Sequence, residues 1–433
     1  MPRLPVVFVA LVCCGLLPAS CGAAEPTSPQ DWPQWRGAKG DNISAFKGIA
    51  TDWDANPPSL QWQLDGMGQG FASVSVVGDR LYTTGNVGDT QAVIAVDQKT
   101  HKIAWSTPLT DSAPKHGYDG SRCTPTVDGD RIFAITSNGQ ISCLKVADGS
   151  VVWKKVFEKE WNGRMMSGWG YSESPLVDGK YVLCTPGSAE AMIVCLDKTN
   201  GKEVWRSAVP DEGSKGSPGA GYSVMAISNG AGVKQYVQLI GRGLIGVRAS
   251  DGKHLWSYNK IANGVADIPT PIVSGDYVFG STGYDDGGSA LLKLKRSGSG
   301  VEAVEQYSRT SKELQNHHGG MVLMGDYLYF GNGHNNGFPV CVDLVSGDVK
   351  WGGKLRGVGQ GSAAITAVDG HLIFRYQSGD VALIEATPKE YKLKGSFKPV
   401  YQERESWAQP IVANGKLYLR EQNTLMCYDI AKK

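Results

Sequence analysis

Short runs of alternating apolar and polar residues, joined by glycine-containing turns, cover most of this 433-residue chain. Glycine, Asn-Gly or Asp-Gly between two apolar segments of period two is a strong local signal for a β-hairpin. Because no amphipathic stretch of helical period interrupts this pattern, it predicts an all-β chain built from copies of one antiparallel unit. The eight turn glycines are Gly78, Gly129, Gly179, Gly230, Gly275, Gly325, Gly370 and Gly415.

A second phrase follows most of these hairpins: an apolar strand, a small residue, a polar turn and a strand that carries a tryptophan. Clear copies end at Trp105, Trp153, Trp205, Trp256 and Trp351, and the first three intervals are 48, 52 and 51 residues. A degraded copy ends at Tyr307. Repetition at this period indicates one supersecondary unit per copy. With four short strands per unit, the pattern predicts a single eight-bladed β-propeller of four-stranded antiparallel blades.

The two ends of the repeat region predict how the ring closes. The last unit stops after its third strand and lacks the tryptophan, whereas an orphan strand with Trp62 precedes the first unit. We expect this N-terminal strand to complete the last blade, because closure removes the exposed sheet edges of a linear array. Residues 59–433 are therefore predicted to form one propeller domain. We interpret Trp62 and the five repeat tryptophans as structural residues between neighbouring blades.

The repeated phrase resembles the tryptophan-docking repeat of the pyrroloquinoline quinone (PQQ) repeat propellers. These include the eight-bladed quinoprotein alcohol dehydrogenases and the outer-membrane assembly lipoprotein BamB. Three further motifs resemble a bacterial cell-envelope subset described as BamB-like or PQQ-like: DWPQWRG at 31–37, WGYSESPLVDG at 169–179 and LQNHHGG at 314–320. The resemblance implies the propeller fold but no single activity, since one fold carries many functions.

The first 24 residues have the three-part layout of a secretory signal: Arg3, an apolar stretch at 6–17 and small residues ending at Ala24. The apolar stretch is too short to span a bilayer, and no later segment is apolar enough. We therefore expect a periplasmic or secreted protein. Cleavage after Ala24 and a lipid anchor on Cys21 remain alternatives, because Pro18 stands where a lipoprotein signal usually has leucine. Residues 25–58 are predicted to be a leader that wraps or tethers the propeller.

Charge and cysteine content narrow the function classes. The 43 basic and 42 acidic residues form no Lys/Arg-rich run, so the sequence gives no sign of binding to nucleic acid or anionic lipid. Three of the nine cysteines lie in the signal region: Cys13, Cys14 and Cys21. Four others occupy repeat positions on different blades and are predicted to be small buried residues without disulfides: Cys143, Cys195, Cys341 and Cys427.

Equivalent positions just before each inner strand of a propeller converge on one mouth of the axial channel. Counting back six or seven residues from each turn glycine, and including the adjacent position, gives a ring with charge, a titratable pair and an aromatic platform. Its members are Arg122, Glu173, Asp267, His317, His318 and Trp407, and loops on the same face add Tyr171, Asn316 and His334. We predict a ligand site there. The structural alternative is ordinary turn chemistry with hydrogen-bonded histidines, and the sequence assigns no metal site.

The resemblance also sets the functional alternatives. Its enzymes hold PQQ over a tryptophan floor, under an adjacent-cysteine disulfide and beside a calcium ion with carboxylate ligands. In this chain Trp407 is placed for stacking, and Glu173 and Asp267 for calcium ligation or base catalysis. The one adjacent cysteine pair lies in the signal region.

We therefore favour a noncatalytic binding or assembly factor similar to BamB, with an envelope protein or a small molecule as partner. The alternatives are a PQQ- and calcium-dependent alcohol or sugar oxidoreductase and a carbohydrate-binding hydrolase or lyase. In the last, His317 and His318 would act with the two carboxylates. No catalytic residue is assigned.

Overall fold

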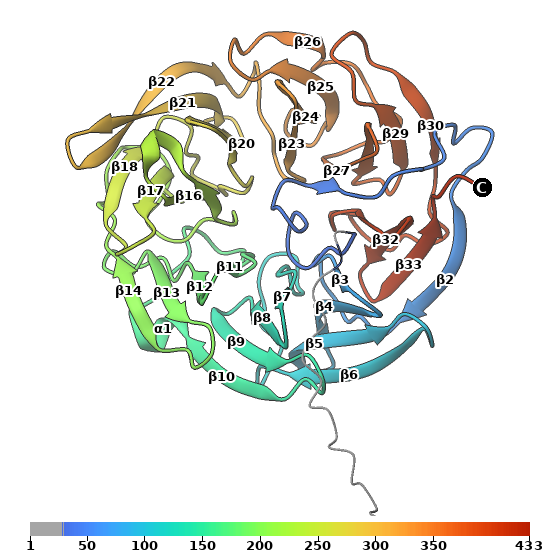
Figure 1. The fold of residues 1–433 in the computed structure, drawn as a ribbon, viewed down its shortest axis with the longest axis horizontal. Coiled ribbons are helices and arrows are strands. Elements are labelled where there is room, and N and C mark those ends of the chain that lie inside the picture. The colour runs from blue at the N-terminus through green and yellow to red at the C-terminus, as the bar shows by residue number, and fades with distance from the viewer. Residues whose placement is uncertain (1–27, 29) are drawn as a thin grey trace, which may run out of the picture.

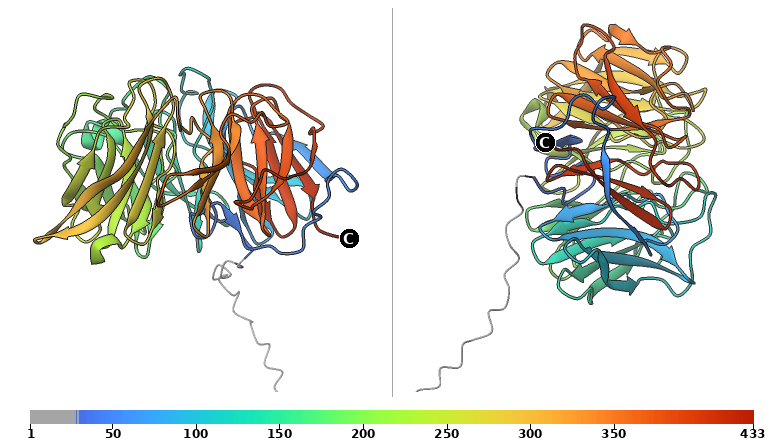
Figure 2. Two further views of the ribbon diagram at one scale, coloured as in Figure 1. Left: turned by 90° about the horizontal axis from the view of Figure 1, so that it is seen from above. Right: turned by 90° about the vertical axis from the view of Figure 1, so that its right-hand side faces the viewer.

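The computed structural model describes Ser28 and residues 30–433, which form eight β-sheets arranged around a central axis (Figure 1). The prediction of an all-β, eight-bladed propeller is confirmed. Seen from the side, the strands of each blade cross the disc from one face to the other (Figure 2). The predicted signal at 1–24, with Cys13, Cys14 and Cys21, lies outside the described residues.

Each blade begins with a short strand near the axis and adds strands outward (Figure 1). Blade 1 contains β3 (Ser75–Val77), β4 (Arg80–Val87), β5 (Thr90–Asp97) and β6 (Lys102–Pro108). Blade 2 contains β7 (Thr126–Asp128), β8 (Arg131–Ile135), β9 (Gln140–Lys145) and β10 (Val151–Val156). Blade 3 contains β11 (Leu176–Asp178), β12 (Tyr181–Cys184), β13 (Ile193–Asp197) and β14 (Glu203–Ser207). Blade 4 contains β15 (Ala226–Ser228), β16 (Gln235–Ile240), β17 (Gly243–Arg248) and β18 (His254–Tyr258).

The second half of the ring repeats this order. Blade 5 contains β19 (Ile272–Ser274), β20 (Tyr277–Thr282), β21 (Gly288–Ser297) and β22 (Gly300–Thr310), and blade 6 contains β23 (Met321–Met324), β24 (Tyr327–Asn332), β25 (Phe338–Asp343) and β26 (Val349–Gly352). Blade 7 contains β27 (Ala363–Val368), β28 (His371–Tyr376), β29 (Val381–Glu385) and β30 (Leu393–Phe397). Two short helical pieces that the sequence did not predict lie in connections: α1 (Phe157–Trp161) and the 3-10 turn η1 (Gly230–Gly232), which takes the place of the fourth hairpin turn.

The ring closes through its eighth blade, as predicted. This blade contains β31 (Ile411–Ala413), β32 (Lys416–Glu421) and β33 (Thr424–Asp429), and the N-terminal strand β2 (Ser59–Asp65) pairs antiparallel with β33. Arg420 joins this blade to the first one. Its guanidinium is buried and donates to Thr83 Oγ1 and to the backbone carbonyls of Met67, Gly68, Ala72 and Thr84. The junction between blade 8 and blade 1, which we call the seam, is thus stabilised by hydrogen bonds from Arg420 as well as by the pairing of β2 with β33.

An N-terminal arm, residues 30–58, lies against the propeller. Its Trp32 is buried and exchanges backbone hydrogen bonds with Val76 on the inner strand of blade 1. Farther on, β1 (Ile43–Ser44) pairs parallel with β27, so that blade 7 has five strands, one more than predicted. This extra strand lies on the axial side of β27, so this part of the arm lies inside the ring (Figure 1). Farther along the chain, the arm reaches the outer strand β30, where the Trp53 backbone N–H donates to the Lys394 carbonyl.

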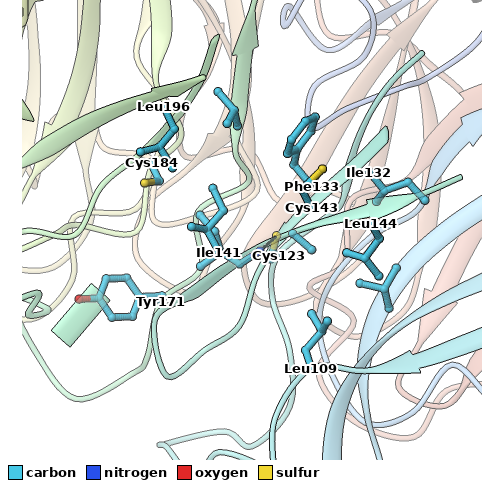
Figure 3. Close-up of a cluster of buried hydrophobic side chains, with 14 of the residues drawn as sticks. Leu109, Cys123, Ile132, Phe133, Ile141, Cys143, Leu144, Tyr171, Cys184 and Leu196 are labelled. Atoms are coloured by element: carbon cyan, nitrogen blue, oxygen red, sulfur yellow. Dashed lines mark hydrogen bonds between the residues drawn. The ribbon is translucent and has the colours of Figure 1, made fainter. Parts of the chain in front are cut away.

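The hydrophobic core lies between neighbouring blades. Figure 3 shows one such cluster, in which Cys143 and Ile141 of blade 2 approach Cys184 and Leu196 of blade 3. All six cysteines in the described part of the chain are free and buried. The prediction that Cys143, Cys195, Cys341 and Cys427 are small buried residues is confirmed, and Cys123 and Cys184 share that environment.

The repeat tryptophans contact the turn of the following blade. The indole N–H groups of Trp105, Trp153 and Trp351 donate to the carbonyls of Val146, Lys198 and Thr387 at 3.3, 3.1 and 2.6 Å. Two tryptophans differ: the indole N–H of Trp256 donates to Gln235 of its own blade, and that of Trp205 has no partner within the described residues. Trp62 stacks on His101 of blade 1 with ring centroids 5.1 Å apart.

These contacts explain the glycine of the repeated phrase. Gly149, Gly201 and Gly252 have positive φ, and a Cβ on each would lie within 2.4 to 2.7 Å of the tryptophan of the preceding blade or its neighbouring Thr107. A side chain there would therefore clash as well as strain the backbone.

Candidate functional site

A cavity of about 380 Å³ opens on the axis, at the face where the inner strands begin. Every blade contributes to its wall, mostly through the segment just before the inner strand and through loops between the second and third strands. Going round the ring, the wall includes Phe71, Tyr118, Arg122, Trp169, Ser172, Tyr222, Ile268, Tyr284, His317, His318, His334, Gln377 and Trp407. We call this cavity the axial pocket. Residues more than 300 positions apart in the chain share its wall because the ring is closed.

The three motifs that carried the resemblance to envelope proteins meet in this pocket. Trp35 and Arg36 come from the motif at 31–37, Trp169 and Ser172 from the motif at 169–179, and His317 to Gly320 from the motif at 314–320. Two of these motifs also contain predicted ring residues, whereas the motif at 31–37 contains none. Their convergence on one cavity shows that the distinctive residues of the chain are concentrated at the axis.

Aromatic rings in edge and tilted contact line much of the wall. Trp407 contacts Phe71 at 4.9 Å and Tyr118 at 4.8 Å between ring centroids, and Tyr118 lies 6.0 Å from Trp169. The indole N–H of Trp407 donates to Gln377 Oε1 at 3.0 Å. This hydrogen bond fixes the indole and leaves its rings as part of the wall. Such rings offer apolar surface for a planar ligand.

Three histidines continue this aromatic wall. The ring centroid of His317 lies 4.4 Å from that of His318 and 4.1 Å from that of His334. Burial and the neighbouring histidines lower the pKa of His317 to about 2, and burial lowers the pKa of His318 to about 4. Burial also lowers the pKa of His334. The first two histidines are therefore neutral at physiological pH and act as hydrogen-bonding rings rather than as cations.

Two arginines supply positive charge. The guanidinium of Arg122 donates to the carbonyls of Gly117 and Tyr118 at 2.7 and 2.6 Å and lies over the Phe71 ring at 5.8 Å. Arg36 is only 3% exposed, and its Nε donates to the Gly40 carbonyl at 2.8 Å. Burial lowers the pKa of each arginine to about 10, so that both remain protonated at neutral pH. The sequence analysis missed Arg36 because it lies in the arm, outside the repeat from which the ring was counted.

The two carboxylates of the predicted ring lie elsewhere, which corrects that prediction. Glu173 is buried and accepts hydrogen bonds from the Thr185 backbone and hydroxyl at 2.8 and 2.7 Å, and from Gln238 at 3.3 Å. Asp267 is buried and accepts from Asn263. Their neighbours Ser172, Ala266 and Ile268 line the pocket instead. Side chains alternate along an extended segment, and an error of one residue in the count turns a side chain away from the cavity.

Two face-loop residues also point away from the pocket. The Tyr171 hydroxyl donates to the Pro186 carbonyl at 2.8 Å, and the Asn316 amide donates to the Gly331 carbonyl at 3.0 Å. Of the nine predicted residues, the wall therefore includes Arg122, His317, His318, His334 and Trp407. The additional wall aromatics Tyr118, Trp169 and Tyr284 have a signal in the sequence, since each lies in a Gly-rich loop on the predicted face.

The fit of PQQ with calcium can be tested on these residues. The aromatic wall and the arginines suit a planar, anionic quinone. Calcium prefers carboxylate and carbonyl oxygens, but none of the described wall residues is an aspartate or a glutamate. Among residues 30–433, no group of three or more His, Cys, Asp or Glu side chains is arranged to hold a metal ion. The calcium-bound arrangement therefore does not fit this pocket.

A closed eight-bladed wheel with a pocket on its axis defines the structural class of the protein. The sequence model of the family described as outer membrane protein assembly factor BamB matches residues 47–160 and 89–353. These matches cover more than half of the chain, and the protein belongs to this family. The prediction of a PQQ-repeat propeller is confirmed. No curated protein matches the chain.

Solved structures share the fold at low sequence identity. A europium-containing methanol dehydrogenase is 14% identical, with 91% of this chain and 90% of that chain covered and a TM-score of 0.64. The quinohemoprotein alcohol dehydrogenase from Comamonas testosteroni is 12% identical, with 93% and 81% covered and a TM-score of 0.66. BamB from Moraxella catarrhalis is 14% identical, with 86% and 97% covered, but its TM-score of 0.43 carries no structural argument. The two dehydrogenases show a common fold and nothing about activity.

Proposed function

We propose that this protein is an exported, noncatalytic binding or assembly factor of the cell envelope, with the axial pocket as its ligand site. One observation carries the proposal: the pocket combines aromatic rings, neutral histidines and two arginines, but no carboxylate among its described wall residues. The calcium-ligating and acid-base roles considered for Glu173 and Asp267 would need these carboxylates at the reacting atoms, and neither residue lines the pocket. Binding needs only shape, apolar surface and a few oriented polar groups.

The proposed location rests on the chain's N-terminal pattern and on its family. We propose a signal at 1–24, a leader at 25–58 and a propeller at 59–433, with a lipid on Cys21 as the alternative to cleavage after Ala24. Mass spectrometry of the exported protein distinguishes these two. The described residues include no helix long and apolar enough to cross a membrane. Since the family is described by an outer membrane assembly factor, an envelope protein is the proposed macromolecular partner.

The competing function is a PQQ-dependent oxidoreductase, a class of enzyme that the repeated phrase also resembles. Two alcohol dehydrogenases share the fold, but a shared fold does not assign the activity. Purified mature protein should be mixed with PQQ and calcium and assayed for dye reduction with a panel of alcohols and sugars. We expect no quinone-dependent turnover. Turnover that requires both PQQ and calcium would overturn the noncatalytic proposal.

A positive test measures binding in the pocket. Small ring compounds should raise the melting temperature of the wild-type protein, because a ligand of the folded state stabilises it by mass action. The rise should be lost in Trp407→Ala, which removes the aromatic wall, and retained in Trp351→Phe, which alters a tryptophan remote from the pocket. Equal rises in wild type and Trp407→Ala would place the binding elsewhere.

A further inference from the structure

Two arginines bring positive charge to the wall of the axial pocket. Arg36 and Arg122 both contribute to its wall, and neither forms an ion pair with any described carboxylate. The Nη1 of Arg36 is buried and lacks a hydrogen-bond partner among the described residues. A buried guanidinium is costly unless an anion or acceptor compensates it. Elsewhere in this chain the buried Arg375 meets that requirement, since it pairs with buried Glu421 at 2.8 Å.

We propose that the axial pocket binds a small ring-bearing organic anion, whose carboxylate is held by Arg36 and Arg122 and whose ring lies against Trp407 and its aromatic neighbours. This inference rests on the proposed binding function and names the ligand class for it. A carboxylate accepts the charge-assisted hydrogen bonds that a guanidinium fork donates, and these are stronger than neutral ones.

Among the titratable side chains of the pocket wall, the two arginines carry the charge. His317 and His318 are neutral at physiological pH, and the wall contains no described aspartate or glutamate. The wall thus has two cations and no carboxylate of its own, which favours a negatively charged ligand. Asp41 near Arg36 and Asp119 near Arg122 lie outside the wall and offset part of this charge. The buried Nε2 of His318 and Nδ1 of His334 also lack partners in the described part of the chain.

The size of the cavity favours a small molecule over a polypeptide. Its volume of about 380 Å³ lies near the lower end of the roughly 300–1,000 Å³ that is usual for small-molecule sites. The edge-to-face and tilted rings around Trp407 give the wall a continuous apolar surface. A planar ring fills such a space with little loss of conformational freedom.

The arm holds Arg36 in place, so that the site depends on a segment outside the repeats. Arg36 has a φ of 66° and is followed by Gly37 with a φ of 82°. A Cβ on Gly37 would lie 3.1 Å from the buried Trp32 ring, and the tight turn of the arm therefore packs against that indole. The β1–β27 pairing that follows anchors the other side of the turn. Between these two anchors Arg36 contributes to the wall of the pocket.

The test compares two probes of the same shape, naphthalene-2-carboxylate and the neutral naphthalene-2-carboxamide, by isothermal titration calorimetry. Wild-type protein should bind the carboxylate at least about tenfold more tightly, because charge-assisted hydrogen bonds exceed neutral ones by about that factor. Arg36→Met should weaken carboxylate binding by about tenfold and leave carboxamide binding within about twofold. The control is Arg309→Met, whose guanidinium lies over Tyr307 away from the pocket.

The outcomes separate this inference from the proposed function. Equal affinities of the two probes for the wild-type protein overturn the anion preference even if both bind. No binding of either probe contradicts the pocket as a ring-binding site, and hence the proposed function. The wild-type comparison stands without any variant, and Arg122→Met serves as the second variant if Arg36→Met does not fold by circular dichroism. Carboxylate binding unchanged in both variants would also overturn the assignment.

Discussion

Ser172 and Glu173 are neighbours in one extended segment, but Ser172 faces the axial pocket and Glu173 faces Thr185 and Gln238 inside the protein. The difference decides their chemistry. Glu173 loses its water and gains three hydrogen-bond donors, and burial raises its pKa to about 8. A neutral, buried carboxyl group here stabilises the fold and does not touch a ligand in the pocket.

The raised pKa of Glu173 gives a testable dependence of stability on pH. The folded state keeps this proton up to a pH of about 8, whereas the unfolded chain loses it near 4.3. The stabilisation is therefore complete below about pH 4 and is lost as pH rises toward 8, at about 1.4 kcal/mol per pH unit. Glu173→Gln should remove this loss, and urea unfolding between pH 5 and 8 measures it. The exposed Glu302→Gln is the control, and parallel curves for Glu173→Gln and wild type would contradict the account.

The neutral histidines give a second prediction at this scale. Because the pocket's positive charge comes from arginines whose pKa values are about 10, carboxylate binding should change less than about twofold between pH 6 and 8. Protonated His317 or His318 would instead make affinity fall as pH rises through about 6.5. Calorimetric titration of naphthalene-2-carboxylate across this range measures the difference. A tenfold fall would contradict the neutral assignment.

At the scale of elements, the strands of each blade follow the order that the repeats predict. The junction between blade 8 and blade 1 is held together by a buried arginine, Arg420. In seven blades the four repeat strands follow one another in the sequence, and blade 7 adds β1 from the arm. The eighth blade joins β2 to β31, β32 and β33 from the other end of the chain. Arg420 lies on β32 and donates to five groups of blade 1 and the segment leading into it. These acceptors are buried, and without the guanidinium they would lose their donor.

Arg420→Met should therefore lower the free energy of unfolding by roughly 3 kcal/mol or more, because each unsatisfied buried group costs about 1–3 kcal/mol. Chemical denaturation followed by tryptophan fluorescence measures the loss. As a matched control, Arg248→Met removes a partly exposed pair with Asp251 and should cost less than about 1 kcal/mol. Similar losses for the two variants would show that the seam does not depend on Arg420.

Most elements could be predicted because their signals are local. Glycine turns and period-two runs mark the hairpins, and the missing fourth strand of the last unit pointed to β2. Counting from the turn glycines could not predict which side chains face the pocket, because an error of one position reverses the direction of a side chain. Glu173 and Asp267 each lie one position from a residue of the wall. The place of Arg36 depends on the parallel pairing of β1 with β27, across more than 300 residues. No local pattern specifies such a contact.

For the whole molecule, circular closure turns scattered residues into one site. Wall residues from Phe71 to Trp407 come from all eight blades, and the arm adds Trp35 and Arg36 from within the ring. A change in blade number or an open seam would separate them. The central claim is thus that a closed wheel and its N-terminal arm together form one pocket for an anionic ring.

The most direct test is a crystal structure of the mature protein with naphthalene-2-carboxylate. The account predicts eight blades closed by β2 and β33, with the naphthalene ring against Trp407 and the carboxylate within hydrogen-bond distance of the Arg36 guanidinium. Ligand density on the outer rim of the blades, or in the pocket with its carboxylate turned away from both Arg36 and Arg122, would contradict it.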